Sequence, residues 1–158
     1  MSFLNQAGVE RPPKRPQGES NQQRETQTRR STVLIVDDHV AMLERVEVLL
    51  APKFDIVGKC ASGEVALQEV TKLEPDVVVL DISMPPGLSG IELARMIRQR
   101  SAKPRFVYLT NHEDAGLALA TQEEGGYAYV VKRCLATDLV AAIEAVRRGE
   151  NFVSDLTS

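Results

Sequence analysis

The chain has 158 residues, of which 43% are hydrophobic and 26% charged, and its formal net charge is −3. This length favours one domain that can bury a core, and the composition is ordinary for a soluble globular protein. No apolar run reaches the roughly 18–20 residues of a membrane span, and the amino terminus lacks a signal-peptide core. We therefore expect a cytoplasmic protein in which Cys60 and Cys134 are free thiols.

The composition of the chain changes near residue 30. Residues 1–30 are rich in Gln, Arg, Pro, Glu and Ser and hold six basic and three acidic residues, whereas the remainder is acidic. This segment has too little apolar surface to offset the entropy of ordering it, so we predict a disordered tail. The tail could contact nucleic acid or an acidic partner, although a solvated leader is the favoured interpretation. We predict a folded domain over 31–153 and a remnant or linker over 154–158.

Strand and helix patterns alternate from Thr32 onward. The strand patterns cover 32–37, 54–60, 76–81, 105–110 and 127–132. Helical spacing of apolar residues covers 40–50, 66–73, 91–97 and 139–146, with a short Ala-rich helix near 115–124. Five strands alternating with five helices predict an α/β fold, a flavodoxin-like (βα)5 doubly wound parallel sheet with strand order 2-1-3-4-5. The alternating pattern of 54–60 is typical of an edge strand.

Acidic residues follow two of these strands. The apolar run Val33–Val36 is followed by Asp37 and Asp38, and the run Val77–Leu80 is followed by Asp81. The expected strand order places both strand ends at the switch point, where open α/β sheets bind ligands. Converging carboxylates repel one another, and a hard divalent cation with oxygen ligands commonly offsets that repulsion. The sequence therefore predicts a Mg²⁺ site at this edge of the sheet.

The last two strands bring a hydroxyl and an ammonium to the same edge, because they end in Thr110 and Lys132. Three carboxylates, one hydroxyl donor and one cation suit a phosphoryl group that is attacked by, or attached to, a carboxylate. Mg²⁺ and Lys132 would neutralise the phosphoryl oxygens, and Thr110 would donate a hydrogen bond to one of them. The set of residues therefore favours phosphoryl chemistry.

Four motifs together resemble the receiver domains of two-component response regulators over about 31–153. The motifs are VLIVDD (33–38), VVVLDISMP (77–85), YLT (108–110) and YVVK (129–132). The resemblance implies that Asp81 accepts a phosphoryl group from a histidine kinase or a small phosphodonor, and that Lys132 pairs with the carboxylate and then with the phosphoryl group. It also implies Mg²⁺ as the cofactor. The implied metal ligands are Asp37, Asp38, Asp81 and the backbone carbonyl of Ser83.

The same resemblance implies a conformational switch rather than a turnover enzyme. Thr110 would move toward the phosphoryl group, which lets Tyr129 turn inward and reshapes the face of the fourth helix, fifth strand and fifth helix. Ser83 and His112 would tune dephosphorylation. One alternative is a pseudo-receiver that binds partners without phosphorylation. Another is an aspartyl-nucleophile phosphatase, a class that generally needs an acid where this chain has Ser83.

Three further segments resemble the NarL/FixJ subfamily. They are VDDH (36–39), FDIVGKCASGEVAL (54–67) and RRGENFVSDLTS (147–158). Those regulators normally continue into a LuxR-type helix-turn-helix, which implies control of transcription through a DNA-binding domain absent from this chain. A stand-alone receiver and a part of a larger regulator both stay open. A homodimer through the fourth helix, fifth strand and fifth helix, or through the first and fifth helices, stays open as well.

Two features depart from the family pattern. The loop 83–90 is one residue longer near Pro86, which leaves the start of the third helix open. Arg133 follows Lys132 where many receivers have Pro. A cis bond before a non-proline residue costs about 3 kcal/mol, so a cis bond cannot be assumed there and the shape of the loop leading to the fifth helix stays open.

Simpler interpretations are available for single residues of the motifs. Asp37 or Asp38 could cap the first helix, because Asp is a favoured N-cap residue. Tyr129 could be a half-exposed aromatic residue of its strand. His39 and His112 could be solvated loop residues, which is the commoner state of loop histidines.

Overall fold

The computed structural model describes residues 29–111 and 127–156. The chain divides into two compact units, Met1–Arg30 and Ser31–Ser158, and the elements described below belong to the second. Nearly all of the tail predicted to be disordered, the helix predicted near 115–124 and His112 lie outside the described residues. No helix within the described ranges combines the length and the apolar character needed to cross a bilayer.

From β2 to β5 the described elements alternate between strands and helices, as predicted. The strands are β2 (Thr32–Val36), β3 (Asp55–Cys60), β4 (Val77–Asp81), β5 (Arg105–Thr110), β6 (Tyr127–Val131) and β7 (Phe152–Val153). The helices are α2 (Val40–Leu50), α3 (Gly63–Leu73), α4 (Gly90–Arg100), the 3₁₀ helix η1 (Lys132–Cys134) and α6 (Leu135–Arg147). The five predicted strands differ from the observed ones by one residue at most at each end.

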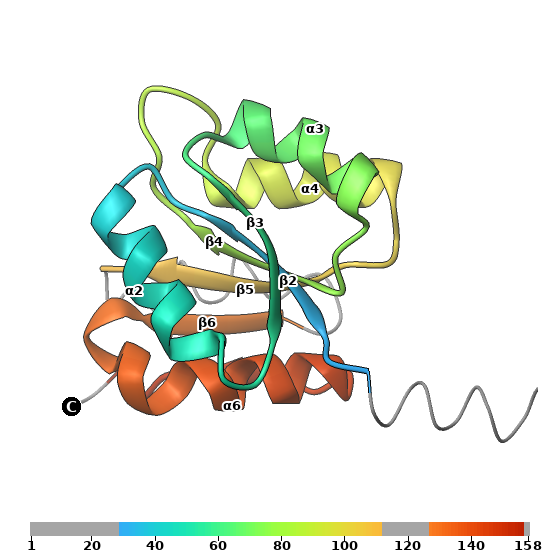
Figure 1. Ribbon diagram of the computed structural model, residues 1–158. Coiled ribbons are helices and arrows are strands. Elements are labelled where there is room, and N and C mark those ends of the chain that lie inside the picture. Colours follow the sequence, from blue (N-terminus) through green and yellow to red (C-terminus); the bar gives the residue numbers. More distant parts are fainter. Residues whose placement is uncertain (1–28, 112–126, 157–158) are drawn as a thin grey trace, which may run out of the picture. The chain divides into compact units, whose positions relative to one another are not determined.

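All strands run parallel in one sheet of order β3-β2-β4-β5-β6-β7 (Figure 1). For the five predicted strands this order is 2-1-3-4-5, which confirms the flavodoxin-like fold. β3 is an edge strand, as predicted, and its residues are mostly exposed or half-buried. The sixth strand, β7, was not predicted, because two residues are too few to show a periodic pattern.

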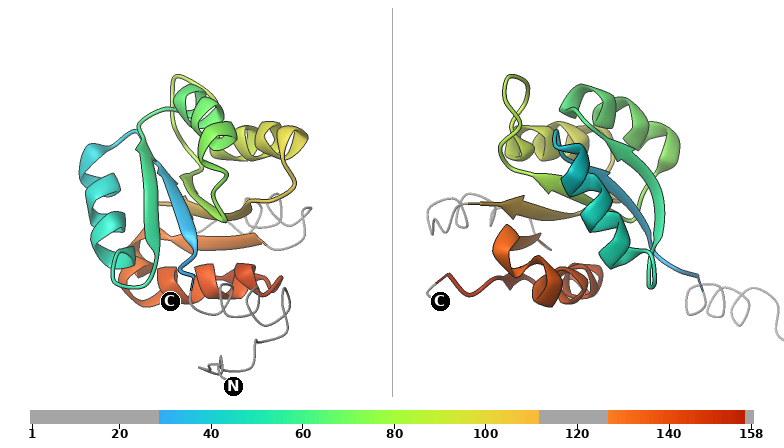
Figure 2. Two further views of the ribbon diagram at one scale, coloured as in Figure 1. Left: turned by 45° about the vertical axis from the view of Figure 1, so that its right-hand side comes forward. Right: turned by 60° about the vertical axis from the view of Figure 1, so that its left-hand side comes forward.

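Helices cover both faces of the sheet, so that two hydrophobic cores form (Figures 1 and 2). α3 and α4 pack on one face, against residues such as Leu34 and Val78. α2 and α6 pack on the other face, against residues such as Val33 and Val79. Successive strand residues point to opposite faces, and here both faces are buried. This is why the strands appear in the sequence as continuous apolar runs.

Local signals start and end the helices of the α3–α4 layer. Ser62 caps α3 by accepting the Val65 N–H at 3.2 Å. Ser89 and Glu92 form a reciprocal capping box at the start of α4, in which each side chain accepts the backbone N–H of the other residue. Glu74 ends α3 in the left-handed conformation, with φ 46°. The capping box settles where the helix after the long loop begins.

Parallel register aligns the ends of four strands at one edge of the sheet. Asp37 follows β2, Asp81 ends β4, Thr110 ends β5 and Lys132 follows β6. The aligned pairs are Val36 with Leu80, Asp81 with Leu109, and Thr110 with Val131. The backbone therefore delivers two carboxylates, a hydroxyl and an ammonium to neighbouring positions.

Gly90 brings the first turn of α4 against the backbone of the strand end at Asp81. Its N–H donates to the carbonyl of Ile82 at 2.7 Å. A Cβ at this position would overlap the carbonyl oxygen of Asp81. In the preceding loop the Pro85–Pro86 bond is cis, and it is the one cis bond among the described residues, so the Lys132–Arg133 bond is trans.

The segment after α6 completes the edge of the sheet beside β6. Ser154 is 3% exposed and donates its N–H to the carbonyl of Tyr129 at 2.9 Å. Its Oγ accepts the N–H of Val131 at 3.2 Å and donates to Asp138 Oδ2 at 2.7 Å. The hydrogen bonding of the folded unit thus extends through Ser154, which is the first residue of the predicted remnant or linker.

Replacing Gly90 by Ala tests the close approach of α4 to the strand end. The added methyl group must push α4 or the Asp81 backbone aside, and overpacking of this kind lowers the free energy of unfolding by about 1–3 kcal/mol. Gly63→Ala is the matched control, because Gly63 also opens a helix after a Ser cap and its Cβ would meet its nearest neighbour at 3.4 Å. Urea denaturation measures both. Equal stability of the two variants would contradict the prediction.

Replacing Ser154 by Ala tests the link between the carboxyl-terminal segment and β6. The substitution leaves the buried N–H of Val131 without its acceptor, which lowers the free energy of unfolding by about 1–3 kcal/mol. Ser101→Ala is the control, since the Ser101 Oγ accepts an exposed hydrogen bond from the Lys103 N–H. Thermal or urea unfolding compares the two variants. A loss no larger for Ser154→Ala than for Ser101→Ala would contradict this account.

Candidate functional site

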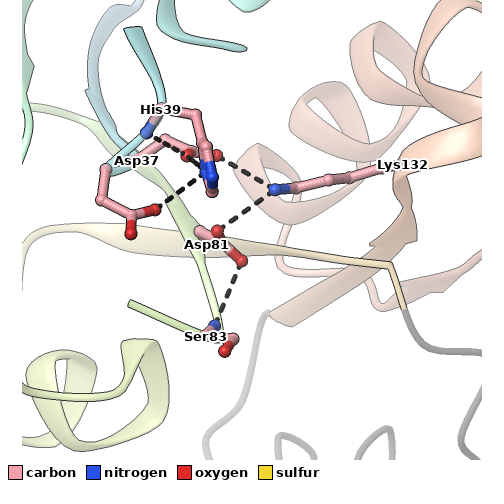
Figure 3. A network of polar contacts seen from close by, with 6 residues as sticks. Asp37, His39, Asp81, Ser83 and Lys132 are labelled. Carbon is pink, nitrogen blue, oxygen red and sulfur yellow. Dashed lines mark hydrogen bonds and ion pairs between the residues drawn. The ribbon is translucent and has the colours of Figure 1, made fainter. Parts of the chain in front are cut away.

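One buried ammonium joins two strand ends at the carboxyl edge of the sheet (Figure 3). Lys132 Nζ lies 3.2 Å from Asp37 Oδ2 and 3.1 Å from Asp81 Oδ2. The three side chains are at most 8% exposed. Lys132 can reach both carboxylates because η1 begins directly after β6 and places this residue at the strand edge. A charged side chain this deeply buried is stable only where it is paired, as it is here.

Asp81 is held by donors on two sides. Its Oδ2 accepts from Lys132, and its Oδ1 accepts the backbone N–H of Ser83 at 3.1 Å. Burial raises the pKa of Asp81 and the nearby Asp37 carboxylate adds to the rise, whereas the Lys132 ammonium and the Ser83 N–H oppose it. The carboxylate is therefore oriented, and its negative charge is only partly compensated by the protein.

Asp37, Asp38 and His39 form the second side of the site. The N–H of His39 donates to Asp37 Oδ1 at 2.9 Å, and its ring Nδ1 is hydrogen-bonded to the same oxygen at 3.3 Å. Nδ1 also lies 3.0 Å from Asp38 Oδ1, but the two atoms are not aligned as a hydrogen bond. The N-cap of α2 is His39, so the interpretation of Asp37 or Asp38 as the helix cap is wrong.

The donor set of this site fits a divalent cation. One ligand atom each from Asp37, Asp38, His39 and Asp81 lies within 4.8 Å of the others. Asp38 Oδ1 is buried and makes no hydrogen bond within the described part of the chain. With its carboxylates ionised, the cluster of three acids and Lys132 has a formal charge of −2, which a divalent ion would offset. Hard carboxylate oxygens are the atoms that such ions bind.

A hollow of about 370 Å³ opens beside Asp38. Its other walls come from the start of α3 and from the loop after β4. The lining residues include Ser62, Glu64, Met84, Pro85 and Gly87. Asp38 is therefore the acid of the cluster that lines this hollow, whereas Asp37 and Asp81 are buried.

The remaining predicted site residues differ in their placement. Thr110 ends β5 and is 2% exposed, and Ser83 is exposed apart from the N–H that it donates to Asp81. Tyr129 is fully buried, so its interpretation as a half-exposed strand residue is wrong. His112 lies outside the described residues.

Sequence reasoning undervalued His39, whose ring contacts two of the three acids. The only signal was its position directly after Asp38, and adjacency in a loop does not determine where a side chain points. In the structure the His39 N–H donates to Asp37 Oδ1, and the ring Nδ1 lies 3.3 Å from the same oxygen.

Comparisons with known proteins agree with this architecture. The family model of the response regulator receiver domain matches residues 33–144. Transcriptional regulatory protein DegU of Brevibacillus brevis is 32% identical over 123 residues, 77% of this chain and 52% of DegU. Nitrate/nitrite response regulator protein NarL of Escherichia coli (strain K12) is 30% identical over 129 residues, 79% of this chain and 58% of NarL. The chain thus spans little more than half the length of these relatives.

A solved structure extends the agreement to three dimensions. The two-component response regulator of the LuxR family from Aurantimonas sp. SI85-9A1 is 33% identical, with a TM-score of 0.73 over 79% of this chain and 90% of that chain. The cluster of Asp37, Asp38 and Asp81 is consistent with the metal site of a receiver domain. The chain belongs to the response regulator receiver domain family.

Proposed function

We propose that this chain is the phosphoacceptor module of a two-component response regulator and that Asp81 is the residue phosphorylated. The observation that carries the proposal is the buried Asp81 carboxylate, oriented by Lys132 and by the Ser83 N–H at the switch point of the sheet. A carboxylate held in this way can present one oxygen to an incoming phosphorus atom.

The proposed reaction transfers a phosphoryl group from the phosphohistidine of a histidine kinase. An oxygen of Asp81 forms the new P–O bond while the P–N bond of the donor breaks, and the electron pair and a proton end on the donor imidazole. Lys132 moves from pairing with the carboxylate to pairing with a phosphoryl oxygen, and Thr110 donates a hydrogen bond to another. Both groups are already buried at this edge of the sheet.

Mg²⁺ is the proposed cofactor, held by Asp37, Asp38, Asp81 and the backbone carbonyl of Ser83. When bound, it supplies charge neutralisation for the phosphoryl oxygens. The buried oxygen of Asp38 without a hydrogen bond supports this assignment. Hydrolysis of the acyl phosphate would then be tuned by Ser83 and His112. The chain acts as a switch rather than a turnover phosphatase, since Ser83 has no acid–base capacity.

The proposed output is control of transcription. The proteins DegU and NarL, whose names describe regulators, are almost twice as long as the region matched here, so we assign DNA contact to an output domain outside this chain. Thr110 and Tyr129 are the proposed switch residues, one at the end of β5 and one within β6. A homodimer would use either the face that includes β6 and α6 or the face of α2 and α6.

Acetyl phosphate with Mg²⁺ tests the phosphoacceptor directly. We expect intact-mass measurement to show about one phosphoryl adduct on the wild-type chain and none on Asp81→Asn, because the amide lacks the nucleophilic oxygen. Asp55→Asn, at an exposed aspartate that opens β3, is the control and should keep the adduct. An adduct that persists on Asp81→Asn would assign the site elsewhere. No adduct on the wild type would favour a phosphorylation-independent module.

Asp38→Asn tests the metal site separately from the chemistry. We expect the affinity for Mg²⁺, measured by calorimetry, to fall by about tenfold or more, since a charged ligand is lost. Without Mg²⁺, the free energy of unfolding should not fall, because the substitution removes one charge from a repelling cluster. Glu64→Gln, on the wall of the same hollow, is the control. Unchanged Mg²⁺ affinity in Asp38→Asn would remove this residue from the proposed ligand set.

A further inference from the structure

His39 occupies an unusual position for a solvated loop histidine. It is the N-cap residue of α2, yet its side chain makes no capping hydrogen bond. Its backbone is extended, and its N–H is already bound to Asp37 Oδ1. The ring Nδ1 is hydrogen-bonded to the same oxygen at 3.3 Å, a contact that a metal ion bound between the two atoms would replace. Figure 3 shows the ring turned toward the acidic side chains rather than away from them.

The distances around Nδ1 match those between ligands of one metal ion. Nδ1 lies 3.0 Å from Asp38 Oδ1 and 3.3 Å from Asp37 Oδ1. Two adjacent ligands of an octahedral ion with bonds of about 2.1 Å lie about 3 Å apart. A ring nitrogen of His39 also belongs to the group of ligand atoms, with Asp81, that lie within 4.8 Å of one another.

We propose that His39 supplies a nitrogen ligand to the metal site and thereby shifts its preference from Mg²⁺ toward transition-metal ions such as Mn²⁺ and Ni²⁺. This inference rests on the proposed function, because it assumes that Asp37 and Asp38 bind a metal. Mg²⁺ prefers oxygen ligands, whereas imidazole favours the later first-row ions, for which affinity rises from Mn²⁺ to Ni²⁺. A site with carboxylates alone would show a weaker preference of this kind.

An ordinary ion pair is the competing explanation for the contacts of His39. The His39 side chain is 72% exposed, and an exposed pair of this kind contributes little to stability. The same exposure makes the residue a clean target, since its replacement removes no buried packing. His112 is the other histidine of the chain, so its replacement controls for binding of Ni²⁺ by an imidazole elsewhere in the sequence.

Calorimetry on the full chain, without a histidine tag and in a mildly alkaline buffer, measures binding of Ni²⁺ and of Mg²⁺ separately. We expect His39→Gln to weaken Ni²⁺ binding by about tenfold or more, and Mg²⁺ binding by less than about threefold. His112→Gln should keep the wild-type values. Equal losses for both ions in His39→Gln, no loss for either, or a Ni²⁺ loss confined to His112→Gln would each overturn the proposal.

Electron spin echo spectroscopy of bound Mn²⁺ supplies a direct readout of the ligand. We expect coupling to an imidazole nitrogen in the wild type and in His112→Gln, and its loss in His39→Gln. Nitrogen coupling that survives in His39→Gln, or is absent from the wild type, overturns the assignment. These measurements are independent of phosphorylation. Failure of Asp81 to accept a phosphoryl group would therefore overturn the proposed function and leave the role of His39 to be decided by the metal data.

Discussion

Lys132 shares one buried ammonium between Asp37 and Asp81, which lie 95 and 51 residues away in the sequence. Two buried carboxylates this close would otherwise repel each other at the edge of the sheet. The pairing requires that β2, β4 and β6 run parallel and end at the same level. The stability of the acidic site therefore depends on the arrangement of the strands in the sheet.

Lys132 neutralises only part of the negative charge of the site, because three acids lie near a single ammonium. Asp38 keeps a buried oxygen without a hydrogen bond, and burial still raises the pKa of Asp81. Both features favour the arrival of further positive charge, whether as a metal ion or as a redistribution of Lys132 toward a phosphoryl group. A site without excess negative charge would attract a metal ion only weakly.

β6 connects the site to the end of the folded unit. It carries Tyr129 and leads directly into Lys132, and its outer edge is bonded by Ser154, which also contacts Asp138 on α6. A change in the position of Lys132 therefore acts on a strand whose other edge is tied to the carboxyl-terminal segment. This is a physical connection between the acidic edge and the part of the chain that follows α6.

The sequence by itself determined the alternation of strands and helices, because buried parallel strands appear as continuous apolar runs. It also determined which residues lie at the strand ends, because these are the residues that follow each run. Tertiary structure alone decided the full burial of Tyr129 and the attachment of Ser154 as part of the edge beside β7. Each of these depends on a hydrogen bond or a packing surface contributed by a distant segment. Local periodicity carries no record of such contacts.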